Sequence, residues 1–328
     1  MKKIKFVSFF IFLAIFNSCK TDLQSKDYTL KGLVFGTSYK ITYLNGTQDY
    51  REALDSLFFS INKSLSTYIP SSDVSKINKG DTSIEIDSYF KEVFEKSKMI
   101  YEKTDGFFDP TVGNLVNAYG FGPNKGKNDL SDEQISEFMK LVGLDKVRLS
   151  GEKIIKEHPK IYLDFNSIAK GYAIDVVARF FNSRNIDNYI IEIGGEIRAK
   201  GVKNQNKPWL VKVVNPVDVE GGFKTINLSN KSMATSGNYR KFRIDSSGKK
   251  FVHTINPKTG LAQESNLLSA SVISNSDCAD VDAYATAFMA MGLEKTKNII
   301  EKNKDLKVIL IYFDDYGNIT EYTNYISK

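Results

Sequence analysis

The chain has 328 residues, of which 41% are hydrophobic and 26% charged, an ordinary composition for a globular protein. Its formal net charge is +6, and lysines and acidic residues alternate along the whole sequence. Because the sequence contains no arginine-rich block and no basic stripe, we expect no nucleic acid partner. The length allows one large module or about two domains.

The first residues have the pattern of an export signal. Three lysines precede an apolar run over 6–16, which is shorter than the about 20 residues of a spanning helix. Cys19 follows Ser18 directly, as in a lipoprotein signal, although plain secretion with cleavage nearby is an alternative. We predict a signal peptide over 1–18, a lipid anchor at Cys19 and a polar tether over 19–27. The protein would then be exported and lipid-anchored at the periplasmic face of the cell membrane.

The remaining segment, 28–328, contains strand and helix patterns in turn. Alternation predicts a strand over 32–44, and apolar residues at helical spacing predict helices over 49–65 and 90–101. A turn-rich loop, TDGFFDPTVG, follows at 104–113, and SDEQ at 131–134 opens a helix with a capping box. Further helices are predicted at 171–184 and 282–292, and further strands at 161–165, 189–201, 209–216, 223–228, 267–274 and 307–313, the last closing the sheet. Because strands come in runs with helices grouped between them, we predict an α+β fold.

LDFNSIAKGYAID, residues 163–175, places a carboxylate and an ammonium six residues apart before a helix. One interpretation is that Asp164 or Asn166 caps the helix and Lys170 is solvated. The other is a ligand site at a helix start, where anions are favoured. The local pattern does not decide between them.

Other loops carry similar ambiguity. His253, one of two histidines, lies in the turn HTINPKTG and is either structural or part of a site. Thr235, Ser236 and Gly237 offer hydroxyl and N–H groups at a predicted turn, which suits phosphate oxygens but also describes a plain loop. GGE at 194–196 is not a dinucleotide-binding pattern, because the third glycine and the following helix are missing.

NSDCADVDAYATAF, residues 275–288, places Asp282 and Thr286 four residues apart on one helix face. Hard oxygen ligands of this kind suit Mg²⁺ or Ca²⁺. A structural interpretation has Asp277 or Asp280 capping the helix, with Asp282 stabilised by the helix dipole.

Together these motifs resemble the FAD:protein FMN transferase (ApbE) family across nearly the whole segment after the tether. The resemblance rests on the order of FGTSYKI, STYIPSSDVSKIN, TDGFFDPTVGNLVNAYGFGP, LDFNSIAKGYAID, IEIGGEIRAKG, ATSGNYRKF, HTINPKTG and ADVDAYATAF. It implies an ApbE-like, T-fold-related α+β structure with mixed sheets and packed helices in one catalytic module.

The resemblance also implies site residues. FAD contacts would map to Phe35, Tyr68, Phe107, Phe108, Asp109, Asp164, Lys170 and Ile255, with Phe35 replacing a common methionine. Metal ligands for Mg²⁺, or Ca²⁺, would be Ser167, Asp282 and Thr286. His253 and Asp282 would be catalytic, with Asp280 as another candidate base, and Asn256 replaces the family's usual aspartate.

The implied reaction is transfer of FMN from FAD to a threonine hydroxyl of an acceptor flavoprotein, with release of AMP. The acceptors would be subunits of membrane redox complexes of the NADH:quinone reductase or Rnf type. Two alternatives remain open at this level: an FAD pyrophosphatase, which would use water as the nucleophile, and a lipid-anchored flavin-binding protein without catalysis.

Overall fold

The computed structural model describes residues 25–123, 126, 130–214, 216, 224–237, 242–244, 250–262 and 266–326. The predicted signal peptide and Cys19 lie outside the described residues. Strand β1 begins at Lys26, so the sheet starts within the segment predicted as a tether. In the described ranges, no helix is both long and apolar enough to cross a membrane.

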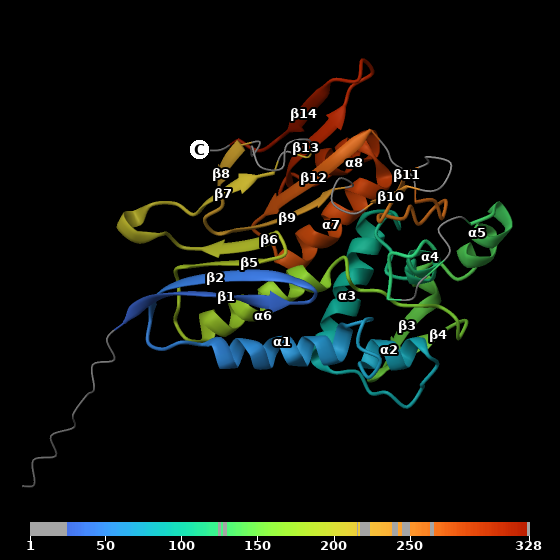
Figure 1. Ribbon diagram of the computed structural model, residues 1–328, viewed down its shortest axis with the longest axis horizontal. Helices are drawn as coiled ribbons and strands as arrows, with labels where there is room; N and C mark the ends of the chain where they lie inside the picture. Colours follow the sequence, from blue (N-terminus) through green and yellow to red (C-terminus); the bar gives the residue numbers. More distant parts are fainter. Residues whose placement is uncertain are drawn as a thin grey trace, which may run out of the picture.

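The centre of the fold is an eight-stranded sheet with the order β1-β2-β5-β6-β9-β12-β13-β14 (Figure 1). Every neighbouring pair in it is antiparallel. The strands are β1 (Lys26–Val34), β2 (Thr37–Gly46), β5 (Tyr189–Ile193), β6 (Glu196–Lys200), β9 (Lys231–Gly237), β12 (Leu267–Ser274), β13 (Lys307–Phe313) and β14 (Ile319–Thr323). In the described ranges, three two-stranded sheets accompany it: β3 (Val147–Ser150) with β4 (Lys153–Lys156), β7 (Leu210–Val213) with β8 (Lys224–Asn227), and β10 (Phe242–Ile244) with β11 (Lys250–Val252).

The helices are α1 (Arg51–Leu65), α2 (Asp73–Asn78), α3 (Ser88–Lys103), α4 (Gly113–Ala118), α5 (Asp132–Met139), α6 (Ala169–Ser183), α7 (Cys278–Met291) and α8 (Leu293–Lys302). The predicted helices at 49–65, 90–101, 131 onward, 171–184 and 282–292 are confirmed, as are the strands within 189–201 and at 267–274. The α+β prediction is confirmed as well.

The two faces of the sheet bury different clusters. The main core joins the sheet to helices α1, α3, α6 and α7, and it includes Ala234 and Val272. Their chain neighbours Met233 and Ile273 belong to a second cluster, which the β7–β8 hairpin covers. Consecutive residues of a strand point to opposite faces, so the helices and this hairpin cover opposite sides of the sheet.

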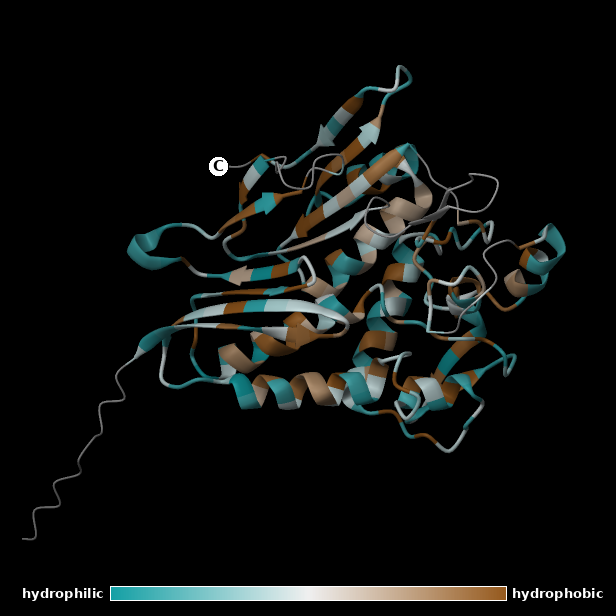
Figure 2. Cartoon of the chain, viewed as in Figure 1, coloured by the Kyte–Doolittle hydropathy of each residue, from teal (hydrophilic) through white to brown (hydrophobic). Residues whose placement is uncertain are grey.

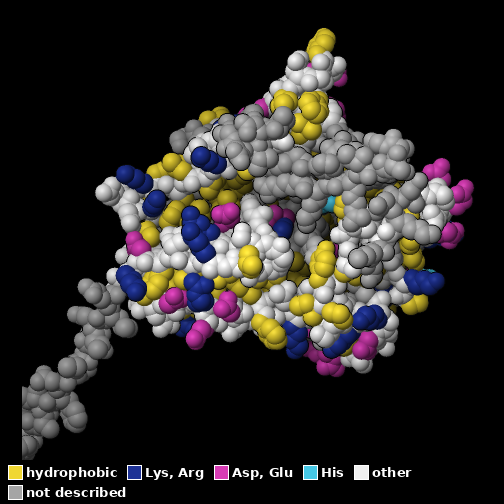
Figure 3. Space-filling view, viewed as in Figure 1, with side chains coloured by type: hydrophobic (Ala, Val, Ile, Leu, Met, Phe, Trp, Pro, Cys, Tyr) yellow, Lys and Arg dark blue, Asp and Glu magenta, His cyan; other side chains and the backbone are white. Residues whose placement is uncertain are grey.

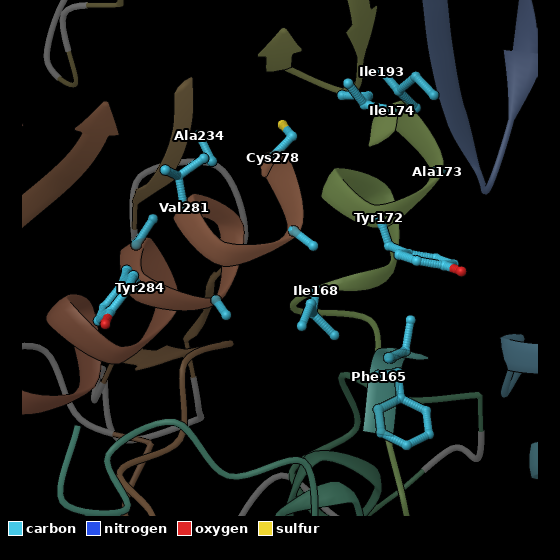
Figure 4. Close-up of a cluster of buried hydrophobic side chains, with 14 of the residues drawn as sticks. Phe165, Ile168, Tyr172, Ala173, Ile174, Ile193, Ala234, Cys278, Val281 and Tyr284 are labelled. Carbon is cyan, nitrogen blue, oxygen red and sulfur yellow. The ribbon is translucent and has the colours of Figure 1, made fainter. Parts of the chain in front are cut away.

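Helix α7 is buried almost all round, and it contains few polar residues apart from its first turns (Figure 2). It packs directly against α6, with Cys278, Val281, Ala173 and Ile174 in the same buried cluster (Figure 4). The two backbones approach closely at Gly171, where a Cβ atom would overlap the carbonyl oxygen of Cys278 and lie 2.8 Å from Cα of Ala279. A glycine is therefore required for the two helices to meet.

Two predicted strands have a different structure. The segment 32–44 is a hairpin, because Phe35 and Gly36 turn the chain with φ values of 51° and 72°. The left-handed conformation is expected of Gly36 but not of a phenylalanine. The segment 161–165 forms only an isolated bridge between Val112 and Tyr162. The side chain of Asn78 pairs with both backbone groups of Leu163 at 2.8 Å, and so takes the place of a neighbouring strand.

Two further expectations were wrong in detail. The residues 235–237 lie on strand β9 rather than in a turn, because they pair with residues 269–271 of β12. Strand β13 does not close the sheet, because β14 pairs with its outer edge.

The contact at Gly171 predicts a specific loss of stability. Gly171→Ala should lower the free energy of unfolding by about 1–3 kcal/mol, since the added methyl group meets backbone atoms of α7 that cannot turn away. Urea denaturation followed by circular dichroism measures this. Ser183→Ala, at an exposed position of the same helix, should be nearly neutral, and equal stability of the two variants would contradict the packing argument.

Candidate functional site

A cavity of about 420 Å³ lies where the β1–β2 turn, the loop at 104–113, the start of α6, strands β6 and β9, and α7 come together. The face of the molecule in Figure 3 is hollowed at its centre, and acidic and basic side chains are visible beside the hollow. Twelve of the site residues expected from the sequence line this cavity: Phe35, Tyr68, Phe107, Phe108, Asp109, Asp164, Ser167, Lys170, His253, Ile255, Asp282 and Thr286. Asp280, the other candidate base, is not among the lining residues and pairs instead with Lys96 at 3.0 Å. The structure thus brings together residues that are up to 251 positions apart (35 to 286).

The polar floor of the cavity is a cluster of three charges. Lys170 Nζ lies 3.0 Å from Glu196 Oε1 and 3.8 Å from Asp282 Oδ2. The backbone N–H of Gly171 donates to the same oxygen of Asp282 at 3.1 Å. The start of α6 therefore supplies Asp282 with both an ammonium and an amide donor. When Asp282 and Glu196 are both ionised, the cluster carries one excess negative charge.

Burial shifts the ionisation of this cluster. It raises the pKa of Asp282 to about 7, against the opposing effect of the Lys170 charge. Burial alone would lower the pKa of Lys170, but the carboxylates of Asp282 and Glu196 outweigh it and raise that pKa. A cation bound beside Asp282 would favour the carboxylate form.

A second ionic network fixes α7 against α6 and β6. Both oxygens of the buried Asp175 on α6 accept from the first turn of α7, namely from the N–H groups of Cys278 and Ala279, each at 2.8 Å. Arg198 on β6 pairs with Asp175 and with Asp277, the latter at 2.8 Å. The N-cap residue Asp277 makes no side-chain capping bond, so Asp175 fills the capping role expected of Asp277 or Asp280.

The oxygen atoms around Asp282 suit a divalent cation. Thr286 follows Asp282 by one helical turn, and its Oγ1 lies 3.3 Å from Ser236 Oγ; Ser167 lines the same cavity. Mg²⁺ is commonly held by one or two carboxylates with hydroxyl or water oxygens and substrate phosphates, and the excess negative charge of the cluster fits such an ion. In the described residues, no group of three or more His, Cys, Asp or Glu side chains is arranged to hold a metal.

Asp164 lies on the loop before α6 and does not cap the helix. Its Oδ1 accepts from the N–H of Asn166 at 2.9 Å, while Asn166 Nδ2 donates to Thr67 Oγ1 at 3.1 Å. The helix N-cap is Ile168, without a side-chain capping bond. Burial raises the pKa of Asp164 to about 6. The capping interpretation of this segment is wrong, and a buried carboxyl is left at the cavity wall.

Aromatic side chains form much of the remaining wall. Phe107 has the ammonium of Lys295 at 4.6 Å from its ring centre, and Phe35 packs edge-on against Phe58 with 5.7 Å between centroids. Tyr68 also lines the cavity and is 57% exposed, so its ring is accessible from solvent. Flat apolar surfaces of this kind suit the rings of a nucleotide or flavin.

Glu196 is the main residue that sequence reasoning missed. It lines the cavity and pairs with Lys170, whereas its motif, IEIGGEIRAKG, contributes to the family resemblance without indicating a role for Glu196. The spacing of Lys170 and Glu196 carries no helical or strand period that could have linked them.

The chain matches the ApbE family model over residues 35–310. The chain belongs to the ApbE family. A protein of Haemophilus influenzae named FAD:protein FMN transferase is 34% identical, over 93% of this chain and 92% of its own length. A protein of Vibrio cholerae with the same name is 32% identical, over 87% of this chain and 88% of its own length.

Solved structures of ApbE proteins have the same fold. The flavin transferase ApbE from Vibrio cholerae superposes with a TM-score of 0.81 at 31% identity, covering 91% of this chain and 97% of that one. The apo form of the flavinyl transferase ApbE from Pseudomonas stutzeri has a TM-score of 0.81 at 29% identity, covering 92% and 95%. The ApbE-like α+β fold predicted from the motifs is thereby confirmed.

The capping network predicts the effect of removing one charge. Asp175→Asn should lower the free energy of unfolding by about 3 kcal/mol, because it leaves Arg198 without its buried partner and takes one acceptor from the start of α7. Chemical denaturation measures the loss. Asp187→Asn removes a surface partner of Lys200 and should cost less than about 1 kcal/mol; comparable losses would mean that Asp175 does not carry this role.

Proposed function

We propose that this chain transfers the FMN moiety of FAD to a threonine hydroxyl of an acceptor protein, with release of AMP. Membership of the ApbE family and the transferase relatives support the reaction class. The observation that carries the proposal is the cluster of Lys170, Glu196 and Asp282 at the floor of an aromatic-lined cavity. In this cavity Lys170 can bind phosphate oxygens, Asp282 can bind a metal ion, and the aromatic side chains can pack against the rings of FAD.

The chemical step is a phosphoryl transfer. The hydroxyl oxygen of the acceptor forms a bond to the phosphorus of the FMN phosphate, and the bond from that phosphorus to the bridging oxygen breaks. AMP leaves with the bridging oxygen, and the hydroxyl proton passes to a base. Catalysis of such a reaction is mainly positioning and charge stabilisation.

The residues of the chain have separate tasks in this scheme. Lys170, the second residue of α6, neutralises a pyrophosphate oxygen and shares the helix start with it. The rings of Tyr68, Phe107 and Phe108 hold the flavin or adenine, together with Phe35, Ile255, Asp109 and Asp164. His253 is the candidate that accepts the hydroxyl proton or orients the phosphate.

Asp282, Thr286 and Ser167 would hold Mg²⁺. When bound, the ion supplies a Lewis acid for the pyrophosphate oxygens and stabilises charge on the departing AMP. Ca²⁺ takes similar oxygen ligands. Measuring the transfer rate with Mg²⁺ and with Ca²⁺ therefore shows which ion supports the reaction.

We also propose the cellular setting. The pattern at 1–19 supports export and a lipid anchor at Cys19, and such an anchor would hold the enzyme at the periplasmic face of the membrane. Acceptors of that setting would be flavoprotein subunits of membrane redox complexes of the NADH:quinone reductase or Rnf type.

The test is incubation of the purified protein with FAD, Mg²⁺ and a candidate acceptor subunit, followed by mass spectrometry of the acceptor. A mass increase of one FMN on a threonine, with equimolar AMP, is expected. Free FMN and AMP in quantity without acceptor would favour an FAD pyrophosphatase. Tight FAD binding with both substrates unchanged would favour a binding protein.

The metal role of Asp282 predicts a kinetic change. Asp282→Asn should slow flavin transfer by about two to three powers of ten and raise the Mg²⁺ concentration needed for half-maximal rate, because charge stabilisation in the transition state is lost. The variant is nearly isosteric, so packing around it is kept. Rates are measured against Mg²⁺ concentration, with the exposed Asp305→Asn as a control, and an unchanged Mg²⁺ dependence would remove Asp282 from the metal site.

The anchor predicts a change in location. Cys19→Ala should move the protein from the membrane fraction to the soluble fraction, because a lipidated cysteine is the proposed membrane contact. Fractionation after a salt wash, with immunoblotting, measures this. Retention of Cys19→Ala in the washed membranes would show that another feature attaches the protein.

A further inference from the structure

Glu196 has one oxygen without a hydrogen-bond partner. Glu196 is the first residue of β6, and its side chain lines the cavity and is 5% exposed. Its Oε1 pairs with Lys170 Nζ at 3.0 Å, whereas Oε2 is buried and accepts no hydrogen bond from any described residue. A buried carboxylate oxygen is normally satisfied, so this one is placed to receive a donor from outside the chain.

The backbone of Gly194 lies beside this oxygen and carries no side chain there. Gly194, in the β5–β6 turn, has φ of 65° and itself lines the cavity. A Cβ atom there would lie 3.4 Å from Glu196 Oε2 and 2.9 Å from Thr37 Cγ2. A side chain at this position would be strained and would occupy the volume next to Oε2.

The charge of Glu196 restricts what it can bind. A phosphate oxygen would be repelled by the carboxylate, and the Lys170 ammonium already supplies its counter-charge. The proposed Mg²⁺ would take its ligands from Asp282, Thr286 and Ser167, which leaves an uncharged donor for Oε2. A hydroxyl is such a donor on both substrates of the proposed reaction: on the ribityl and ribose parts of FAD, and on the threonine of the acceptor.

We propose that Glu196 is a substrate-binding residue whose Oε2 accepts a hydrogen bond from a substrate hydroxyl while its Oε1 holds Lys170. The identity of the substrate rests on the proposed function. FAD can bind without the acceptor, so a hydroxyl of FAD would affect the FAD affinity measured without acceptor. A hydroxyl of the acceptor threonine would affect only the transfer rate at saturating FAD.

The experiment uses Glu196→Gln, with Glu192→Gln on the neighbouring strand β5, outside the cavity lining, as the matched control. If FAD supplies the hydroxyl, the dissociation constant for FAD should rise about tenfold or more in Glu196→Gln, because a charge-assisted hydrogen bond is lost. If the acceptor supplies it, FAD affinity is kept and the transfer rate at saturating FAD falls by a similar factor. Either result supports the proposal.

A second arm tests whether Glu196 acts only through Lys170. The same substitution is made in the Lys170→Met background, in a double-mutant cycle. A loss that persists there supports direct contact, and a loss that disappears overturns it. The proposal also fails if Glu196→Gln matches Glu192→Gln in both FAD affinity and transfer, or if only the Mg²⁺ dependence changes.

Thermal unfolding of each apo variant shows whether the fold is kept. A Glu196→Gln variant that loses FAD binding only because it is unfolded at the assay temperature counts against the proposal. Absence of transfer by the wild-type protein would overturn the proposed function alone, since the FAD-binding arm needs no acceptor.

Discussion

The close contact between α6 and α7 is the constraint on which the site depends. Gly171 allows the two backbones to meet, and its N–H then reaches the carboxylate of Asp282 at 3.1 Å. One turn further along α6, Asp175 accepts from the first N–H groups of α7. Packing, capping and site geometry are thus consequences of one helix crossing.

The antiparallel sheet supplies the third side of this arrangement. Strand β6 carries Glu196 at its first residue and Arg198 two positions on, and both point to the helices because side chains of one face recur every second residue. Arg198 joins the capping network and Glu196 joins the Lys170 cluster. The same strand therefore holds both an ion pair of the helix-capping network and an ion pair at the cavity.

The cavity combines two kinds of surface with different physical roles. Aromatic side chains from the β1–β2 turn and the 104–113 loop give apolar area without fixed charge, which suits flat rings. The charged floor at the start of α6 is desolvated, so its electrostatic effects are stronger than in water. A nucleotide offers both flat rings and charged phosphates, so a cavity with both kinds of surface suits one.

The sequence by itself determined the helices with clear period and caps, such as the capping box at Ser131 and Gln134, and the ordered motifs of the ApbE family predicted twelve residues that line the cavity. Local signals failed where tertiary partners decide the conformation: Phe35 takes a left-handed turn, and Asn78 replaces a strand beside Leu163. Only the tertiary structure showed that Asp175 caps α7 and that Glu196 meets Lys170, because these contacts join residues on different elements. The energies of these contacts depend on how deeply the side chains are buried and how far apart they lie, and neither can be read from the order of residues in the sequence.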